Sequence, residues 1–374
     1  MKRLILTTDV SGAGNIGAAR LADIVIALER RLVWGPPLSQ AQLDAFFAVR
    51  GSQDLGLHWQ DYTPAWRLER SGGKDLGFIE FCSRYDQIEL WIDPDPNAQL
   101  NLIWLLDFLR AHEEPASKMK FVQADFAIPE REPEELARWQ PIRVSVTKGH
   151  LDVAGVAWRA YRSPTPQDWF NLLALDLSLL PGLRWAAVEL LNELPRRTTG
   201  LGATEMWMLA RISEGSAIVE NIFSGLVQRT DRGAFGSWET GELLNGLAHC
   251  PVPAIAGLDE GPFAMELYKD RERRRRYFRS KPSLTPLGKA ILEGKEDFSR
   301  HNPIHRWWAA PNWSTTACGA GTLRTASWSR PNGSARASAG RPHARACPGQ
   351  PRLPFPATRK TGMAGINPAM TNAS

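Results

Sequence analysis

Residues 87–112 read QIELWIDPDPNAQLNLIWLLDFLRAH, and this stretch decides the fold class. Its first part, Gln87–Ile92, is a short apolar run that is typical of a buried strand. Asp95 then suits the N-cap of a helix, and Pro96 suits its first position. The segment up to about His112 is apolar on nearly every face, so we expect a buried helix. A buried strand that leads into a buried helix favours an α/β fold.

The same alternation of strand and helix signals runs through residues 1–128. Short apolar runs and segments with helical spacing predict three more strands and three more helices, at 3–8, 15–21, 24–28, 40–49, 74–84 and 118–124. Strands separated by helices favour a mostly parallel sheet covered by helices on both faces. We therefore expect an α/β domain over residues 1–128.

Two further regions follow this domain. Residues 129–199 show helical spacing broken by prolines, which predicts a helical connector. Residues 200–298 predict a small α+β domain with three helices, a hairpin from extended runs at 253–258 and 263–267, and a closing helix. The closing segment, 284–292, has the pattern LTxxGxxxL. This order of elements resembles a winged helix-turn-helix, in which such a pattern is common.

The composition changes after Trp308. Residues 309–374 contain eight basic residues and no acidic one, whereas the whole chain contains 45 basic and 40 acidic residues. Residues 1–308 therefore carry 37 basic and 40 acidic residues, a net charge of −3, and the basic pI belongs to the tail. We expect the extension 299–374 to be low-complexity and disordered. Its tail is either a basic arm that binds nucleic acid or the product of a frameshift after residue 308.

The beginning of the chain and its cysteines indicate a cytoplasmic protein. The start, MKRLILTTD, has two basic residues but only a three-residue apolar run, which does not fit a secretory signal. No run of 18 or more apolar residues occurs, so no membrane partner is expected. Cys82 and Cys250 are the only cysteines before residue 309, and their distance indicates a reducing compartment without a disulfide frame or a zinc site.

The beginning of the chain resembles a bacterial family known only as domain of unknown function 1835. Residues 4–14, LILTTDVSGAG, are similar to the strand and the Asp-Ser-Ala-Gly-type turn of that family, and residues 33–36, VWGP, to its later Gly-Pro motif. Val10, between the Asp and the Ser, departs from the family's turn. The resemblance covers about residues 1–130, and a second uncharacterised domain often follows in that family. It implies an α/β fold and a bacterial source, but no activity.

Polar residues at the ends of two predicted strands form the first candidate site. A Gly-bearing turn into a helix offers N–H groups to an anion, and Asp9 could hold a ribose, an amine or a metal ion. Asp93 and Asp95 follow the strand Gln87–Ile92 and could share the same rim. The alternative is that these residues only cap helices and shape turns. The candidate ligand-binding residues are Thr8, Asp9, Ser11, Gly12, Gly14 and Asp93.

The basic run 270–279, DRERRRRYFR, is the second candidate site. A winged domain would use such a run to contact DNA phosphates, whereas charge runs are more often solvated helix faces. The helix expected at 238–248 carries Glu239 and Glu242 but no Arg or Lys, which makes it a poor reader of a major groove. The candidate nucleic-acid-binding residues are Arg271, Arg273, Arg274, Arg275, Arg276 and Arg279.

Two functions remain open at this level. In the first, the chain is a ligand-responsive regulatory or interaction protein: a small anionic or nucleotide-like ligand binds at the Asp9 rim, and residues 200–298 contact DNA or protein. In the second, it is a metal-dependent enzyme that acts on a nucleotide or phosphoester, with Asp9, Ser11 and Asp93 around the metal ion. The sequence contains no P-loop, Ser-His-Asp arrangement or complete Rossmann fingerprint, identifies no cofactor, and assigns no metal ligands. This lack of a complete catalytic constellation favours the first function.

Overall fold

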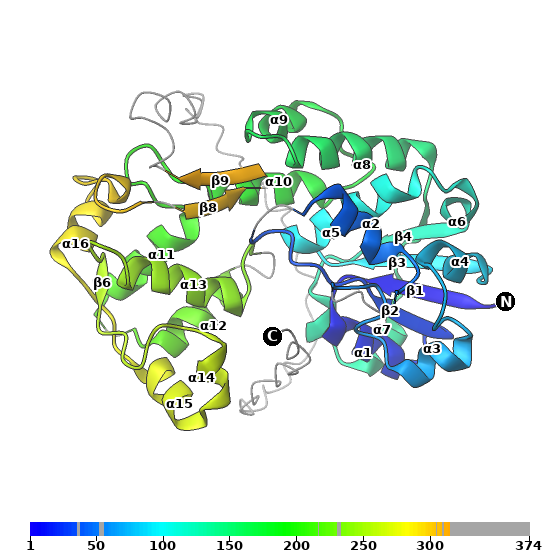
Figure 1. The fold of residues 1–374 in the computed structure, drawn as a ribbon, viewed down its shortest axis with the longest axis horizontal. Coiled ribbons are helices and arrows are strands. Elements are labelled where there is room, and N and C mark those ends of the chain that lie inside the picture. Colours follow the sequence, from blue (N-terminus) through cyan, green and yellow to red (C-terminus); the bar gives the residue numbers. More distant parts are fainter. Residues whose placement is uncertain are drawn as a thin grey trace, which may run out of the picture. The chain divides into compact units, whose positions relative to one another are not determined.

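A five-stranded sheet with the strand order β2-β1-β3-β4-β5 forms the first part of the fold (Figure 1). The strands β1 (Arg3–Thr7), β2 (Ile24–Ala27), β3 (Gln87–Ile92) and β4 (Met119–Gln123) are parallel, and the short β5 (Val144–Ser145) pairs antiparallel with β4. The predicted mostly parallel sheet with flanking helices is thus confirmed. The computed structural model describes residues 1–35, 38–51, 56–215, 217–229, 233–303, 305–308 and 310–314, with only the backbone at 113, 227–229, 305–308 and 310–314.

Each face of the sheet has its own core, because successive strand residues point to opposite faces. On one face, α1 (Val10–Ala18) and α7 (Pro133–Arg138) cover a small core that includes Ile5, Trp91 and Val122. The opposite face packs against a much larger core, built with α2, α4, α5, α8, α9 and α10. The bounds of these helices are Gln40–Phe47, Phe78–Ser83, Pro96–Leu109, Lys148–Tyr161, Gln167–Asn171 and Leu183–Asn192.

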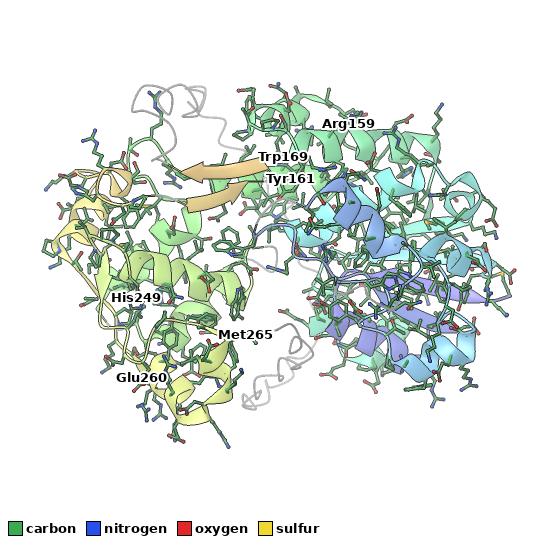
Figure 2. All side chains as sticks on the ribbon, in the orientation of Figure 1. Arg159, Tyr161, Trp169, His249, Glu260 and Met265 are labelled. Atoms are coloured by element: carbon green, nitrogen blue, oxygen red, sulfur yellow. The ribbon has the colours of Figure 1, made fainter. Side chains whose placement is uncertain are left out.

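The buried helix α5 is confirmed. Asp95 is its N-cap and accepts a hydrogen bond of 3.0 Å from the backbone N–H of Ala98, and Pro96 is its first residue. The helix is buried along almost its whole length, between the sheet and the helices of the predicted connector. Tyr161 of α8 and Trp169 of α9 belong to the same core, with ring centroids 5.2 Å apart (Figure 2). The connector helices therefore complete the core of the α/β domain.

Glu89 is a fully buried carboxylate in the middle of β3. It accepts hydrogen bonds from Arg3 (2.7 Å), Arg143 (2.9 Å) and Trp91 (2.8 Å). Burial alone would raise the pKa of Glu89, but these hydrogen bonds and the two arginine charges outweigh burial and lower it. The network joins β1, β3 and the segment before β5.

Two predictions for the first part of the chain were wrong in detail, and one helix was not predicted. The segment Asp9–Gly14 is not a turn, because α1 already begins at Val10 with Asp9 as its N-cap. The helix expected at 74–84 is shorter, Phe78–Ser83. A helix that was not predicted, α3 (Ala65–Ser71), precedes it. Two short helical segments, α6 (Glu113–Ser117) and η1 (Ile128–Glu130), flank β4. Pro36, part of the Gly-Pro motif, lies outside the described residues.

A separate hydrophobic core begins at Leu201 and gathers the helices of the second region. These helices are α11 (Ala203–Ser213), α12 (Val219–Arg229), α13 (Ser237–Ala248), α14 (Met265–Lys269), α15 (Arg271–Arg279) and α16 (Pro286–Leu292). The predicted hairpin was wrong, because the second extended run is the helix α14. Instead, β6 (Ile255–Ala256) pairs antiparallel with β7 (Ser283–Leu284), which lies beyond α15 in the chain.

The LTxxG pattern has a direct structural reason. Thr285 caps α16 by accepting a hydrogen bond of 3.2 Å from the backbone N–H of Gly288. A Cβ atom at Gly288 would collide with the backbone oxygen of Ala254, so α16 approaches this backbone only because residue 288 is glycine. At α11, by contrast, the N-cap is Gly202, and the Thr204 hydroxyl donates a hydrogen bond of 2.7 Å to Glu193.

The beginning of the predicted extension 299–374 is structured. A 3-10 turn, η3 (Phe298–Arg300), is followed by an antiparallel pair, β8 (His305–Trp308) and β9 (Ala310–Ser314). The rest of the predicted extension, from 315 to 374, lies outside the described residues, as do the alternatives for its origin. None of the helices in the described part of the chain combines the length and the apolarity that a bilayer crossing requires.

Candidate functional site

The carboxyl ends of β1, β2 and β3 bring acidic side chains to one edge of the sheet. In the parallel register, Thr7 of β1 pairs with Ala27 of β2 and with Trp91 of β3, so the three strands end together. The residues that follow these ends include the carboxyls Asp9, Glu29, Asp93 and Asp95. Ligands of open α/β sheets bind at this edge. We call these four side chains the acidic edge.

The carboxylates of the acidic edge repel one another. Burial, followed by the charge of Asp95, raises the pKa of Asp93 well above its ordinary value. Burial also raises the pKa of Asp95, and burial followed by the charge of Asp9 raises the pKa of Glu29. Like charges in a poorly solvated place favour the protonated forms. A positive charge or hydrogen-bond donors would relieve this repulsion.

The N-terminus of α1 is already occupied by carboxylates. Asp9 accepts a hydrogen bond of 2.7 Å from the backbone N–H of Gly12, and Glu29 accepts one of 3.2 Å from that of Val10. Gly12 is buried, and a Cβ atom there would lie 3.4 Å from Ile128, so this glycine serves the packing of α1. Ser11 and Gly14 are exposed on the outer side of α1. This arrangement disfavours the anion predicted for the turn.

Asp93 is the most unusual member of the acidic edge. Its side chain is 3% exposed, and its Oδ1 accepts a hydrogen bond of 2.6 Å from the backbone N–H of Ile128. Its second oxygen, Oδ2, is buried and has no hydrogen-bond partner. Buried polar atoms are nearly always paired, and an unpaired one costs free energy. Asp93 therefore holds an acceptor, or an acid proton, that the protein itself does not use.

Further unpartnered oxygens lie on both sides of Asp93. The Gln99 amide donates to the backbone oxygen of Asp93 over 2.8 Å, while the Gln99 Oε1 is buried without a partner. Thr7 Oγ1 and Asn101 Oδ1 are also unpartnered, and both residues line a small cavity of about 10 Å³ with Thr8. This cavity has the size of one water molecule. The sheet edge thus holds several buried oxygens that can accept a hydrogen bond.

Arg31 is the cation next to the acidic edge. Its charge lowers the pKa of both Glu29 and Asp95, opposing the effect of burial on each carboxyl. At the same time its guanidinium binds both carboxylate oxygens of Glu239 in α13, at 3.0 and 2.6 Å. Backbone groups of the neighbouring residues Arg30 and Leu32 are held by the side chain of Asn97. Arg31 therefore connects the acidic edge to the second core region.

The acidic edge does not form a metal centre. Within the described residues, no group of three or more His, Cys, Asp and Glu side chains is placed to hold a metal ion. Asp9 and Asp93 each use one oxygen on a backbone N–H, and Ser11 faces outward on α1. The three residues of the metal hypothesis are therefore not assembled around one point.

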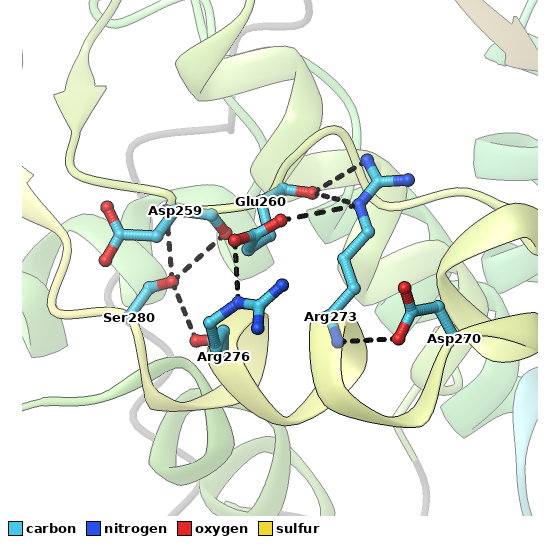
Figure 3. A network of polar contacts seen from close by, with 6 residues as sticks. All are labelled: Asp259, Glu260, Asp270, Arg273, Arg276 and Ser280. Carbon is cyan, nitrogen blue, oxygen red and sulfur yellow. Dashed lines mark hydrogen bonds and ion pairs between the residues drawn. The ribbon is translucent and has the colours of Figure 1, made fainter.

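The arginines of the second candidate site lie on the helix α15 and divide into three sets by their contacts. Glu260 holds the first group: its backbone oxygen accepts hydrogen bonds of 3.1 and 2.9 Å from Arg273, and its carboxylate accepts one of 2.7 Å from Arg276 (Figure 3). Arg274 lies over the ring of Tyr268, 5.7 Å from its centroid. Among the described residues, no hydrogen bond or ion pair engages the side chains of the other three: Arg271, Arg275 and Arg279.

The helix α13 occupies the place of a recognition helix, and the acidic residue in its first turn, Glu239, does not face solvent. Glu239 is 2% exposed and accepts a hydrogen bond of 2.9 Å from the backbone N–H of Gly236. It is therefore a capping residue and a partner of Arg31. Glu29, Arg31 and Glu260 were not predicted from the sequence. A signal existed only for Glu29, which follows a predicted strand end, because partners from distant segments leave no local pattern.

Comparisons with known proteins add no relative. No protein-family model matches the chain, and no curated protein is detectably similar to it in sequence. The resemblance to the domain of unknown function 1835 family therefore stays a prediction.

Proposed function

We propose that this chain is a ligand-responsive regulatory or interaction protein. Its acidic edge binds a small molecule that brings hydrogen-bond donors or a positive charge, and the region 200–298 binds a macromolecular partner. The observation that carries the proposal is the buried Oδ2 of Asp93, which has no partner at the carboxyl edge of a parallel sheet. A carboxyl with a strongly raised pKa in such a place is a candidate functional group.

The chemistry of the ligand follows from the groups that face it. The first N–H groups of α1 are taken by Asp9 and Glu29, so an anionic group would meet carboxylates instead of donors. An amine or a sugar hydroxyl would instead donate to these carboxylates, and charge-assisted hydrogen bonds of this kind are the strong ones. The ligand class we expect is therefore amines and nucleosides, without a requirement for phosphate.

Arg31 provides a physical route from ligand to partner. It interacts with the acidic edge through its charge and with Glu239 through two contacts. A cationic ligand at the edge would compete with Arg31 for the same carboxylates. It would thereby change the balance between the interaction of Arg31 with the acidic edge and its ion pair with Glu239. Such a ligand shifts an equilibrium only if it has different affinities for the two arrangements. We propose that the position of Arg31 causes this difference in ligand affinity.

Thermal unfolding of the full chain tests the ligand site. We would measure the midpoint temperature with adenosine, with spermidine and with inorganic phosphate. A ligand at 100 times its Kd stabilises the folded state by about 2.7 kcal/mol. We expect adenosine or spermidine to raise the midpoint and phosphate to leave it unchanged.

Two variants make this test specific. Asp9→Asn keeps a good N-cap for α1 but removes the charge, and Asp93→Asn keeps the acceptor for Ile128. Both should abolish the ligand-induced rise, while Asp152→Asn on the exposed face of α8 should retain it. A rise of equal size in Asp93→Asn and in the unchanged protein would contradict the proposed site.

A further inference from the structure

The inner face of α15 is a structural support. Asp270 caps the helix by accepting a hydrogen bond of 3.0 Å from the backbone N–H of Arg273. Arg273 and Arg276 then fix the loop at Glu260, whose backbone has the left-handed φ of 66° that few residues other than glycine adopt (Figure 3). Tyr277 is fully buried below them. These contacts anchor α15 and determine which side of it faces solvent.

The outer face of α15 carries a row of free cations. Arg271, Arg275 and Arg279 are exposed and lie four residues apart, so they share one side of the helix. With a rise of about 1.5 Å per residue, the row is about 12 Å long. Lys269 at the end of α14 and Lys281 after α15 are also exposed. Two acidic residues, Asp270 and Glu272, flank Arg271 in the sequence, and Glu272 also lies three residues before Arg275.

The composition of this face indicates which kind of polyanion it fits. Membrane-surface helices need apolar side chains beside their cations, but the aromatic residues of α15 face inward. Tyr277 is buried, and Phe278 packs against Phe223 with ring centroids 5.0 Å apart. A row of arginines without apolar neighbours, about 6 Å apart along the helix axis, suits the phosphate backbone of DNA, whose phosphates lie about 3.4 Å apart along the axis of each strand. Guanidinium groups bind phosphate oxygens in a bidentate manner.

We propose that Arg271, Arg275 and Arg279 bind the phosphate backbone of double-stranded DNA without reading its sequence. Arg273 and Arg276, although part of the same basic run, are support residues and do not contact the DNA. This proposal names the partner of the region 200–298 and in that sense rests on the proposed function. We expect no base readout by α13, because this helix carries no Arg or Lys.

The salt dependence of DNA binding by the full chain tests the proposal. A matched pair of variants is needed, because the basic tail adds its own attraction. The first variant is Arg271→Gln/Arg275→Gln/Arg279→Gln. The second is Arg70→Gln/Arg138→Gln/Arg159→Gln, which removes the same charge from exposed positions in the α/β domain and keeps the same tail. Fluorescence anisotropy with a short mixed-sequence duplex would give the affinity between about 50 and 200 mM salt.

Each phosphate contact contributes about 0.9 to the slope of log affinity against log salt. We expect the α15 variant to lower the magnitude of this slope by about 2–3 relative to the matched variant, with weaker binding at low salt. Equal slopes for the two variants would overturn the proposal, and so would binding of the unchanged chain to anionic lipid vesicles but not to the duplex. Circular dichroism would verify that both variants fold.

The variant Arg273→Gln/Arg276→Gln tests whether these two arginines only anchor α15 or also bind DNA. We expect it to lower the midpoint of thermal unfolding but to retain the slope of the unchanged protein. A slope reduced as much as in the outer-face variant would contradict the division of α15 into two faces. Failure of DNA binding with an intact adenosine or spermidine response would overturn this inference alone. Loss of that response with intact DNA binding would overturn only the ligand site.

Discussion

The substitution Asp93→Asn should stabilise this protein while it removes the proposed ligand site. The buried carboxyl has one oxygen on the Ile128 N–H and one oxygen without a partner. Asparagine has the same shape, so its Oδ1 can keep the bond to Ile128. Its amide N–H groups would face the surroundings of Asp95, Asp9 and Glu130, whose charges raise the pKa of Asp93. In the variant, an amide N–H that can donate a hydrogen bond therefore takes the place of the unpaired Oδ2, which can only accept one when ionised.

The size of the expected stabilisation follows from the unpaired Oδ2 of Asp93. A buried polar group without a partner costs about 1–3 kcal/mol, and we expect Asp93→Asn to recover most of this free energy of unfolding. In domains of 150–250 residues, 1 kcal/mol corresponds to a change of about 2–4 °C in the unfolding midpoint. The expected rise is therefore several degrees, which is unusual because most substitutions of buried residues destabilise.

The pH dependence of stability independently predicts that Asp93→Asn stabilises the protein. The pKa of Asp93 is raised in the folded state, so the folded protein binds this proton more tightly than the unfolded chain does. Ionisation of Asp93 therefore costs stability at any pH above its raised folded pKa. That cost disappears as the pH falls through the folded pKa towards the ordinary value of an aspartate. Asparagine does not ionise, so the advantage of the variant should be largest at alkaline pH and shrink on acidification.

Urea unfolding at a series of pH values would measure this difference. Asp152→Asn on the exposed face of α8 is the control, because it makes the same change of charge at an exposed position. We expect the control to differ little from the unchanged protein at every pH. The reasoning is refuted if Asp93→Asn is less stable than the unchanged protein at neutral pH, or if its advantage does not fall with pH.

Three further outcomes can be checked by urea unfolding. Glu89→Gln should cost about 2–4 kcal/mol, less than the usual 3–5 for breaking a buried pair because its arginine partners are partly exposed; equal stability would refute this. Since the pKa of Glu89 is lowered, its contribution is present above the unfolded pKa and is lost as pH falls through the folded pKa, so the cost should vanish in acid. Gly288→Ala should cost about 1–3 kcal/mol or more, because its Cβ atom meets the Ala254 backbone oxygen; a neutral effect would contradict this packing. Arg31→Gln should weaken the link to Glu239 and raise the pKa of Asp95 further, so stability should fall more steeply with rising pH than in Arg70→Gln.

The backbone of the α/β domain was largely predictable because its signals are local. Gln87–Ile92 is an apolar run of strand length, and the cap and proline before α5 fix where that helix begins. The start of α1 was missed for an equally local reason. Gly12 and Gly14 favour a turn by propensity, yet the cap at Asp9 and the packing of Gly12 against Ile128 outweigh the cost of glycine in a helix.

The second region was less predictable because its pairing is not local. The expected hairpin joined two neighbouring segments, whereas β6 pairs with β7 across the helices α14 and α15. The basic run was found by composition alone, but its division into support and free residues depends on Glu260, eleven residues before the first residue of the helix. No spacing rule identifies such a partner. The same holds for Arg31 and Glu239, which are far apart in the chain.

Asp9 and Asp93 differ in what the folded chain requires of them, and this difference separates binding from structure. Asp9 caps α1, so its carboxylate has a structural task that asparagine can also perform. Asp93 performs its structural task with one oxygen and keeps the other unpaired at a cost in stability. Folded proteins retain such costs mainly where function uses the group. If only packing mattered, asparagine at position 93 would serve better, so the carboxyl itself is the part of this site that folding does not explain.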